Sequence, residues 1–533
     1  MIYLDNSATT KPFGEAADAV DRALREDFFN PAAAYSPAVQ LHARIEKGRA
    51  QMLRTLKADA GKLVFTSGGT EANNLAVFGA LSALRGRGRH VITTTVEHAS
   101  VAGVFHTLEE NGYEVTWLPV DAHGALRPDT LKNALRADTC LVSFMHVNNE
   151  VGAINDILAL SELTKKHCPR ALVHCDGVQA YGRLTPNLSV CPIDLYAVSA
   201  HKFHGPKGAG ALYVREGVRI EPLFMGGGQE GGLRSGTSNA PATLGMLEAA
   251  KVCYRTQREL VGRLSGCKRA LVEGLAGIGD MFVNGPPPEE GAPHILNVSF
   301  LGVRGETLLH SLEQHGIYVS TGSACSAHSH RESRVLAALG ICGERLLGAV
   351  RISFGAYNSP AEMPEVDVWM GVSQYPRAAA LLTRALGGEW IFECARDDSV
   401  VGGGSRILTT APWQAYLKIA EGCDNCCSYC AIPAIRGPYR SRSLESLTAE
   451  AETLAAQGVK ELILVAQDTT RYGTDLYGRP MLTVLLERLH ALPFTWLRVL
   501  YCYPDETNAA LIDEMAAVAS PDQAPLRPAT PTP

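Results

Sequence analysis

Seven short apolar segments separated by helical stretches constrain the fold of this chain more than any other feature. Apolar residues run almost continuously through each segment, and helical stretches such as 70–84 lie between several of them. Strands that are buried on both faces show this pattern, because helices cover both sides of a parallel sheet. We therefore predict an α/β fold with a mostly parallel sheet. Its strands are expected at 62–67, 90–95, 114–120, 139–147, 171–176, 195–200 and 210–214.

Composition and charge indicate a globular cytoplasmic protein. The chain has 533 residues, of which 46% are hydrophobic and 20% charged, with a formal net charge of −6. This length predicts two or three domains. The charge gives no reason to expect binding to nucleic acids or membranes, and no apolar run is long enough to cross a bilayer. The first residues, MIYLDNSATT, lack the pattern of a secretory signal, so the 14 cysteines are expected as thiols for metals or catalysis.

Side chains capable of chemistry follow the predicted strands at the points where the strands end. The stretch TSGGTEANN at 66–74 runs from a strand through glycines into a helix, whose first amides could hold a phosphate. His98, Asn148, Asp176 and Lys202 follow four other strands. A lysine in a loop such as SAHKFHGPKG is by itself an ordinary polar residue. Ligands collect at the carboxyl ends of the strands of an open parallel sheet, however, so these groups together predict a ligand site.

This set of groups matches what pyridoxal phosphate needs from a protein. Lys202 would hold the cofactor covalently, and Asp176 would pair with its protonated pyridine nitrogen. On these residues the chain resembles the class V aminotransferases and, more closely, the cysteine desulfurases. The resemblance spans about 1–358 and rests on YLDNSATT, FTSGGTEANN, EHAS, NNEVG, SAHKFHGPKG, GGGQEGGLRSGTSN and STGSACSAHS. It implies the pyridoxal-phosphate transferase fold type I over 1–360, with a large domain at about 15–250 and a small α/β lobe from 1–14 and 251–360.

The resemblance also implies roles for individual residues. His98 would stack on the cofactor ring and act in catalysis with Lys202, and Gln179 would bond the phenolic oxygen. The planar guanidinium of Arg351 suits a substrate carboxylate, although a surface ion pair is the alternative. The residues implied in cofactor binding are Gly69, Thr70, His98, Asn148, Asp176, Gln179, Ser199, Ala200, His201, Lys202 and Thr237. The residues implied in substrate binding are Asn30, Asn148 and Arg351.

Cys325 is the candidate sulfur nucleophile. It lies in YVSTGSACSAHSHRES at 318–333, where small polar residues are typical of a loop, and an exposed thiol beside basic groups gains reactivity. His328 and His330 close by leave a zinc site open as an alternative. Other cysteines sit within or beside apolar segments and are expected in the core. These are Cys140, Cys175, Cys191 and Cys253.

The resemblance implies a reaction and its partners. L-cysteine would be converted to L-alanine, and Cys325 would carry its sulfur as a persulfide for iron–sulfur cluster or thio-cofactor assembly. The acceptor would be an iron–sulfur scaffold or another sulfur-acceptor protein. A homodimer is implied as well, because Thr237 would reach a phosphate across a dimer interface.

A second motif, EGCDNCCSYC at 421–430, predicts a metal centre. Cys423, Cys427 and Cys430 have the spacing of three ligands of a [4Fe–4S] cluster. The fourth iron would stay open for S-adenosylmethionine, as in radical-SAM enzymes. A structural zinc site is the alternative.

The flanks of this motif resemble radical-SAM methylthiotransferases that modify a ribosomal protein. The segment MPEVDVWMGVSQYPRAAALL implies that 361–410 is a linker similar to the end of their amino-terminal domain. Residues 411–518 would form a partial radical-SAM (β/α) barrel of three strand–helix units, at 415–457, 460–490 and 495–518. The proline-rich end, 519–533, is expected to be disordered.

Two functional hypotheses follow. The first is a cysteine desulfurase with an appended [4Fe–4S]-binding fragment, because the barrel is too short to close. The second is a methylthiotransferase with a fused sulfur-donating domain. A third view is that two neighbouring genes have been joined and that only the first half functions.

Overall fold

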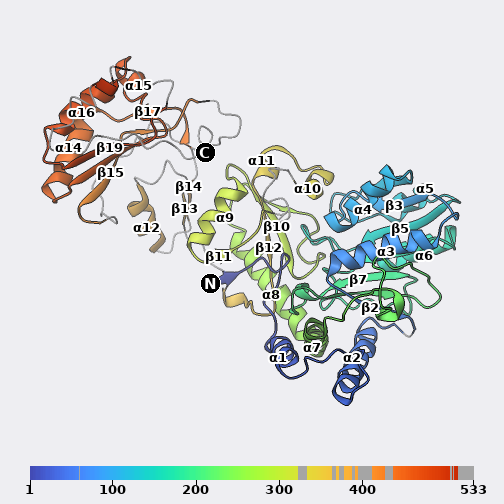
Figure 1. The fold of residues 1–533 in the computed structure, drawn as a ribbon. Coiled ribbons are helices and arrows are strands. Elements are labelled where there is room, and N and C mark those ends of the chain that lie inside the picture. Colours follow the sequence, from blue (N-terminus) through green and yellow to red (C-terminus); the bar gives the residue numbers. More distant parts are fainter. Residues whose placement is uncertain are drawn as a thin grey trace. The chain divides into compact units, whose positions relative to one another are not determined.

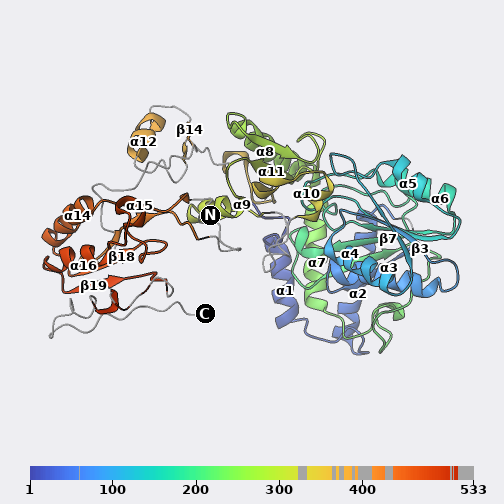
Figure 2. The same cartoon turned by 90° about the horizontal axis from the view of Figure 1, so that it is seen from above.

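The computed structural model divides the chain into two compact units, Met1–Glu365 and Val366–Pro533, which are drawn in Figures 1 and 2. It describes residues 1–58, 60–321, 333–362, 411–425 and 436–503, with short stretches at 368–370, 377–386, 391–393 and 511–513 and the single residues 507 and 509. No helix among these described residues is long and apolar enough to span a membrane.

A seven-stranded sheet forms the centre of the first unit, with strand order β2-β8-β7-β6-β5-β3-β4. All seven predicted strands are present, and β3, β5, β7 and β8 are buried along their full length. The strands are β2 (Lys62–Thr66), β3 (His90–Thr94), β4 (Glu114–Leu118), β5 (Thr139–Met145), β6 (Leu172–Asp176), β7 (Leu195–Ser199) and β8 (Gly210–Val214).

One strand departs from the parallel arrangement. β8 runs antiparallel to both of its neighbours, β7 and β2, whereas the other pairs are parallel. The connection 200–209 between β7 and β8 is too short for the crossover that a parallel pair needs. This short connection also holds Lys202, so the reversal of the chain places that lysine at the edge where β7 ends.

Helices cover both faces of this sheet (Figures 1 and 2). Helix α3 (Gly69–Ala83) packs with α4 (Ala99–Glu110) over apolar side chains of the strands. Helix α5 (Pro128–Ala134) packs with α6 (Ile157–His167). The chain moves outward along the sheet from β3 to β4 and returns to β5 and β6. Right-handed crossovers therefore put the two helix pairs on opposite faces, and the direction changes between β3 and β5. Ligands bind at such switch points.

The rest of the first unit contains smaller sheets and further helices. A three-stranded antiparallel sheet has the order β12-β10-β9, and β1 pairs with β11 in parallel. The strands are β1 (Ile2–Tyr3), β9 (Met281–Asn284), β10 (Ile295–Phe300), β11 (Ile317–Tyr318) and β12 (Ala349–Ser353). The helices are α1 (Gly14–Arg25), α2 (Ser36–Thr55), α7 (Ala240–Arg255), α8 (Gln257–Leu275), α9 (Gly305–Gln314), α10 (Arg334–Ala338) and α11 (Gly343–Leu347).

The second unit contains a parallel sheet of the order β15-β18-β19. Helices α14 (Leu444–Ala456) and α16 (Leu482–His490) contribute to one apolar core with its strands. These strands are β15 (Gln414–Lys418), β18 (Glu461–Val465) and β19 (Trp496–Val499). They begin the three predicted strand–helix units. Smaller elements are β13 (Val368–Met370), α12 (Ala378–Leu386), β14 (Ile391–Glu393), β16 (Ala420–Glu421), β17 (Arg440–Ser441) and α15 (Thr474–Tyr477).

Candidate active site at the carboxyl edge of the large sheet

The structure brings three predicted site residues together at the edge where the parallel strands end. Asp176 is the last residue of β6, and Lys202 lies in a single 3-10 turn directly after β7. His98 follows β3 and caps the start of α4. The charges of Asp176 and Lys202 both act on the pKa of His98, so the three groups share one electrostatic environment.

Asp176 is a buried carboxylate held by two donors. The side-chain amide of Asn73 donates to Oδ2 at 2.9 Å, and the backbone N–H of Val178 donates to Oδ1 at 3.0 Å. These two bonds fix the direction of the carboxylate, as a partner for a pyridine nitrogen requires. Asn73 lies in the stretch that predicted a phosphate cradle, and its contact with Asp176 was not predicted.

The imidazole of His98 is held by the residue two positions further on. Its Nδ1 accepts the backbone N–H of Ser100 at 3.1 Å and lies 2.8 Å from the hydroxyl of Ser100. Burial lowers the pKa of His98; the positive charges of Lys202 and Arg334 lower it further, and Asp176 opposes them. The ring is therefore neutral at neutral pH and suited to lie against another ring.

Glu97 ties the ends of β3 and β5 together beside this imidazole. Its Oε1 accepts the hydroxyl of Thr94 at 2.7 Å and the backbone N–H of Met145 at 3.0 Å. Burial raises the pKa of Glu97 to about 8, and the charge of Asp176 adds to the rise. A group of this kind rigidifies the frame on which His98 is mounted. The motif EHAS contained this glutamate, but no role was predicted for it.

Residues 5–10, which we call the N-terminal strap, cross the site next to the lysine. Lys202 Nζ donates to the carbonyl oxygens of Ser7 at 2.5 Å and Ala8 at 2.7 Å. The amide of Gln179 donates to the same oxygen of Ser7 at 3.0 Å. His201 lies 3.2 Å from the hydroxyl of Thr9. The motif YLDNSATT carried the family resemblance, and the structure shows that this strap contacts three of the predicted cofactor residues.

The predicted phosphate cradle fits a phosphate group. A Cβ at Gly69 would come within 2.8 Å of Val178 and 3.3 Å of Ser199, so only glycine lets the start of α3 approach β7 this closely. The hydroxyl of Ser199 is buried there without a hydrogen-bond partner in the described part of the chain. Burial, with Lys202 and Lys207, lowers the pKa of His201 to about 4, so its ring is neutral. The first-turn amides of α3, which have no partner within the helix, and the hydroxyl of Ser199 are the kinds of donor that a phosphate requires.

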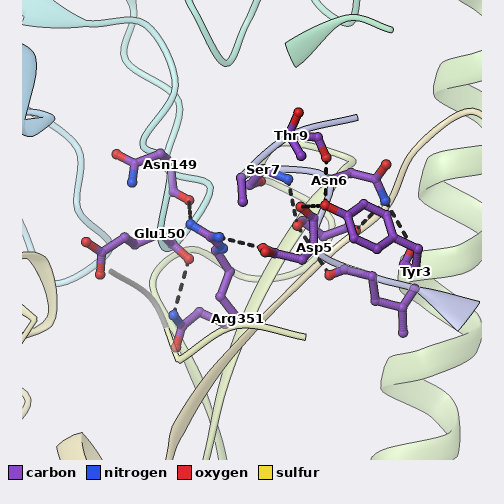
Figure 3. Close-up of polar contacts among 12 residues, drawn as sticks. Tyr3, Asp5, Asn6, Ser7, Thr9, Asn149, Glu150 and Arg351 are labelled. Atoms are coloured by element: carbon purple, nitrogen blue, oxygen red, sulfur yellow. Dashed lines mark hydrogen bonds and ion pairs between the residues drawn. The ribbon is translucent and has the colours of Figure 1, made fainter. Parts of the chain in front are cut away.

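Arg351 is deeply buried, which rules out the alternative of a surface ion pair. It lies on strand β12, and only 3% of its side chain is exposed. Nη2 pairs with Asp5 of the strap at 2.7 Å, and Nη1 donates to the carbonyl of Asn149 at 3.1 Å (Figure 3). Tyr3 donates to the carbonyls of Asp5 and Thr9 and so braces the strap. A substrate carboxylate would therefore meet a guanidinium that already has a carboxylate partner.

Three other predicted residues stand apart from this cluster. Asn148 is buried at the end of β5, but its side-chain oxygen accepts N–H groups of its own turn and its amide donates to Val96. Asn30 is exposed and accepts the N–H of Ala32. Thr237 lines a cavity of about 890 Å³ between α2, β2 and the 228–239 segment, and Lys202 does not line it. The roles of these three residues stay predictions.

The cysteines expected in the core are buried, as predicted. Burial raises the pKa of Cys140 to about 11 and that of Cys253 to about 12, and it also raises the pKa of Cys175 and Cys191. These thiols are therefore protonated and unreactive at neutral pH. Cys325, His328 and His330 lie outside the described residues.

Of the three predicted iron ligands, only Cys423 is among the described residues; Cys427 and Cys430 are not. Cys423 is buried two residues after the end of β16, and its sulfur accepts the backbone N–H of Asn425 at 3.4 Å. Gly422 before it has a φ of +77°, and a Cβ there would come within 2.0 Å of the carbonyl oxygen of Pro438. An N–H directed at a buried sulfur suits a thiolate ligand, so this residue fits an iron–sulfur cluster.

Comparisons with known proteins agree with this geometry. Residues 2–366 match the family model of class V aminotransferases, and residues 417–521 match that of the radical SAM superfamily. The cysteine desulfurase IscS of Dictyoglomus turgidum is 39% identical over 363 residues, covering 68% of this chain and 91% of that protein. The IscS of Methanosarcina thermophila is 40% identical over 365 residues, covering 68% and 90%.

Solved structures extend the likeness to the fold. A NifS-like protein superimposes with a TM-score of 0.64 at 34% identity, covering 72% of this chain and 98% of the other. SspA in complex with cysteine gives a TM-score of 0.59 at 30% identity, covering 67% and 100%. The chain therefore belongs to the class V aminotransferase family, whose cofactor is pyridoxal phosphate, and it carries a radical SAM domain behind the aminotransferase domain.

Proposed function

We propose that the chain is a pyridoxal-phosphate-dependent cysteine desulfurase that converts L-cysteine to L-alanine. The observation that carries this proposal is the cluster of Lys202, Asp176 and His98 at the carboxyl edge of the large sheet. Support comes from the desulfurases that are 39% and 40% identical to the chain over this domain, and from the structural likeness to SspA, which was solved with cysteine.

Each residue of the cluster has a distinct task in this proposal. Pyridoxal phosphate, when bound, supplies an electron sink for the substrate carbanion. Asp176 would accept a hydrogen bond from the pyridine nitrogen, and the neutral ring of His98 would stack on the cofactor ring. Lys202 Nζ, whose contacts with Ser7 and Ala8 keep it near the strap, takes the proton from the substrate α-carbon. The cradle at Gly69 and Ser199 would hold the phosphate.

The sulfur leaves by nucleophilic attack in this proposal. The Cys325 thiolate attacks the sulfur of the substrate, a new S–S bond forms, and the C–S bond breaks. Its electron pair stays on the substrate β-carbon, which takes a proton and becomes the methyl group of alanine. Cysteine and the Cys325 thiol thus give alanine and the Cys325 persulfide, and no outside oxidant is needed.

The amounts of alanine and sulfur produced test this function. Purified protein loaded with pyridoxal phosphate should form one alanine per cysteine consumed, and a thiol reductant should release an equal amount of sulfide. The Cys325→Ser variant should keep the bound cofactor and lose sulfur transfer. Normal turnover by that variant would remove Cys325 from the mechanism, and the absence of alanine would refute the whole proposal.

The radical SAM domain supports a second candidate, a methylthiotransferase that receives sulfur from the first domain. In this proposal Cys423, Cys427 and Cys430 hold a [4Fe–4S] cluster that binds S-adenosylmethionine. The match over 417–521 and the buried sulfur of Cys423 favour it. After anaerobic reconstitution with iron and sulfide, and with a low-potential one-electron reductant added, the protein should cleave S-adenosylmethionine to methionine and 5′-deoxyadenosine. Cleavage no faster in the wild type than in Cys423→Ala would contradict it.

We also propose that the protein is a cytoplasmic homodimer that passes sulfur to an iron–sulfur scaffold or another acceptor protein. Thr237 lines a cavity outside its own Lys202 site, which supports a role in the site of a second copy. Sedimentation of the full chain tests the dimer, and Thr237→Ala should weaken cofactor binding if the role is correct.

A further inference from the structure

A chain of side-chain hydrogen bonds joins Asp176 to His98 through Asn73 and Ser100, for which no role was predicted. Asn73 on α3 is 1% exposed, and its Nδ2 lies 2.9 Å from Asp176 Oδ2 and 2.9 Å from the hydroxyl oxygen of Ser100. That oxygen lies 2.8 Å from Nδ1 of His98. Asn73 and Ser100 thus link the carboxylate of Asp176, proposed to pair with the pyridine nitrogen, to the imidazole of His98, proposed to stack on the cofactor ring.

The direction of each proton in this chain follows from the partners. A carboxylate only accepts, so the amide nitrogen of Asn73 must face Asp176, and its second N–H is donated to the oxygen of Ser100. The backbone N–H of Ser100 is directed at Nδ1 of His98, so Nδ1 carries no proton. The hydroxyl of Ser100 therefore donates to Nδ1. The proton of the neutral imidazole is left on Nε2.

The cost of this arrangement indicates that it serves more than packing. The side-chain oxygen of Asn73 is buried and has no hydrogen-bond partner within the described residues. A buried polar atom without a partner is destabilising, and an apolar side chain at this position would avoid that loss. Asn73 is therefore used for its two donors, and both of them act on the site.

We propose that Asn73 and Ser100 are positioning residues that hold His98 as the Nε2–H tautomer and fix it in register with Asp176. This inference rests on the proposed function for its catalytic meaning. A proton on Nδ1 would face the backbone N–H and the hydroxyl of Ser100, so the chain opposes protonation of His98. The other charges acting on this ring are Asp176, Lys202 and Arg334, and all three are retained when Asn73 or Ser100 is replaced.

Nitrogen NMR of the cofactor-free protein tests the inference without any turnover. In histidine-labelled wild type, His98 should give a protonated Nε2 and a bare Nδ1 at pH 7. Ser100→Ala and Asn73→Ala should each raise the pKa of His98 by about half a unit to one unit. Ser100→Ala removes the hydroxyl that donates to Nδ1, and Asn73→Ala leaves that hydroxyl free to rotate. The double variant should show no larger rise than the greater single change.

Two further variants separate positioning from a structural effect. Asn74→Ala is the matched control, because Asn74 donates to the carbonyls of Thr70 and Ser100 and to neither Asp176 nor His98. Asn74→Ala should leave the pKa of His98 unchanged. Ser100→Thr keeps a hydroxyl at this position, so it should show the wild-type pKa of His98 and not the raised value of Ser100→Ala. In the loaded enzyme, Ser100→Ala should lower kcat about tenfold with KM unchanged.

Two experimental results would contradict this inference. A protonated Nδ1 or an imidazolium in the wild type at pH 7 would overturn it, and that measurement needs no variant. A wild-type titration in Ser100→Ala would overturn it as well. Neither result touches the production of alanine, so failure here is distinguishable from failure of the desulfurase proposal.

Discussion

The two units differ in how their functional side chains are supported. In the first unit, seven strands with helices on both faces bring residues from distant parts of the chain into one buried cluster. In the second unit, the described sheet has three strands, and β19 alternates between exposed and buried positions. Trp496 and Arg498 of β19 are exposed, whereas Leu497 and Val499 are buried. The first unit thus surrounds its site with supporting contacts, whereas in the described sheet of the second unit the central strand β18 is buried on both faces and the edge strand β19 on only one.

The largest expected effect breaks the first site without touching the second unit. Lys202→Ala should lower alanine production by at least about 10³-fold, because it removes both the cofactor linkage and the proton acceptor. Lys207→Ala is the matched control, since this exposed lysine lies in the same loop. It should keep nearly full activity, and equal losses in both variants would contradict the assignment of Lys202.

A core substitution in the second unit tests whether the two units unfold independently. Leu464 of β18 is fully buried in its apolar core, so Leu464→Ala should destabilise that unit by about 2–5 kcal/mol. Leu476→Ala, at a position that is 49% exposed, should cost less than about 1 kcal/mol. Calorimetry of the full chain would show which thermal transition moves. If the thermal transition of the first unit shifted by the same amount, the two units would unfold together.

The ion pair of Arg351 tests how far the first site depends on the strap. Asp5→Asn should destabilise the first unit by about 3 kcal/mol, because it leaves a buried guanidinium without its carboxylate. The exposed pair of Arg25 and Asp21 provides the control, and Asp21→Asn should leave the free energy of unfolding nearly unchanged. Denaturant unfolding measures both values. Similar losses in the two variants would mean that the pair of Arg351 contributes no more than a surface contact.

The large sheet could be predicted from the sequence because strands buried on both faces leave continuous apolar runs. The direction of β8 follows from the short connection that precedes it, although the apolar pattern alone does not contain it. Contacts such as those of Lys202 with the strap join residues almost 200 positions apart, with |i−j| values of 194 and 195. Local patterns carry no information on such contacts. The same holds for Asn73, whose amide could be placed on α3 but not directed at Asp176.

Acid sensitivity should also separate the two units. Burial lowers the pKa of His146, His174, His201 and His204 of the first unit to about 4. An unfolded histidine titrates near about 6.5, so between these values the unfolded state binds more protons than the folded state. The first unit should therefore lose stability as the pH falls from 6.5 towards 4, by about 3 kcal/mol for each fully buried ring.

His174→Gln should flatten this part of the stability curve, because His174 is fully buried between strands and hydrogen-bonded to Ser143. His106→Gln is the control, since His106 is exposed on α4 and pairs with Glu109. The test is the thermal midpoint Tm of the first unit measured across this pH range. An unchanged slope in His174→Gln would mean that the acid sensitivity comes from other groups, such as the carboxylates that both units contain.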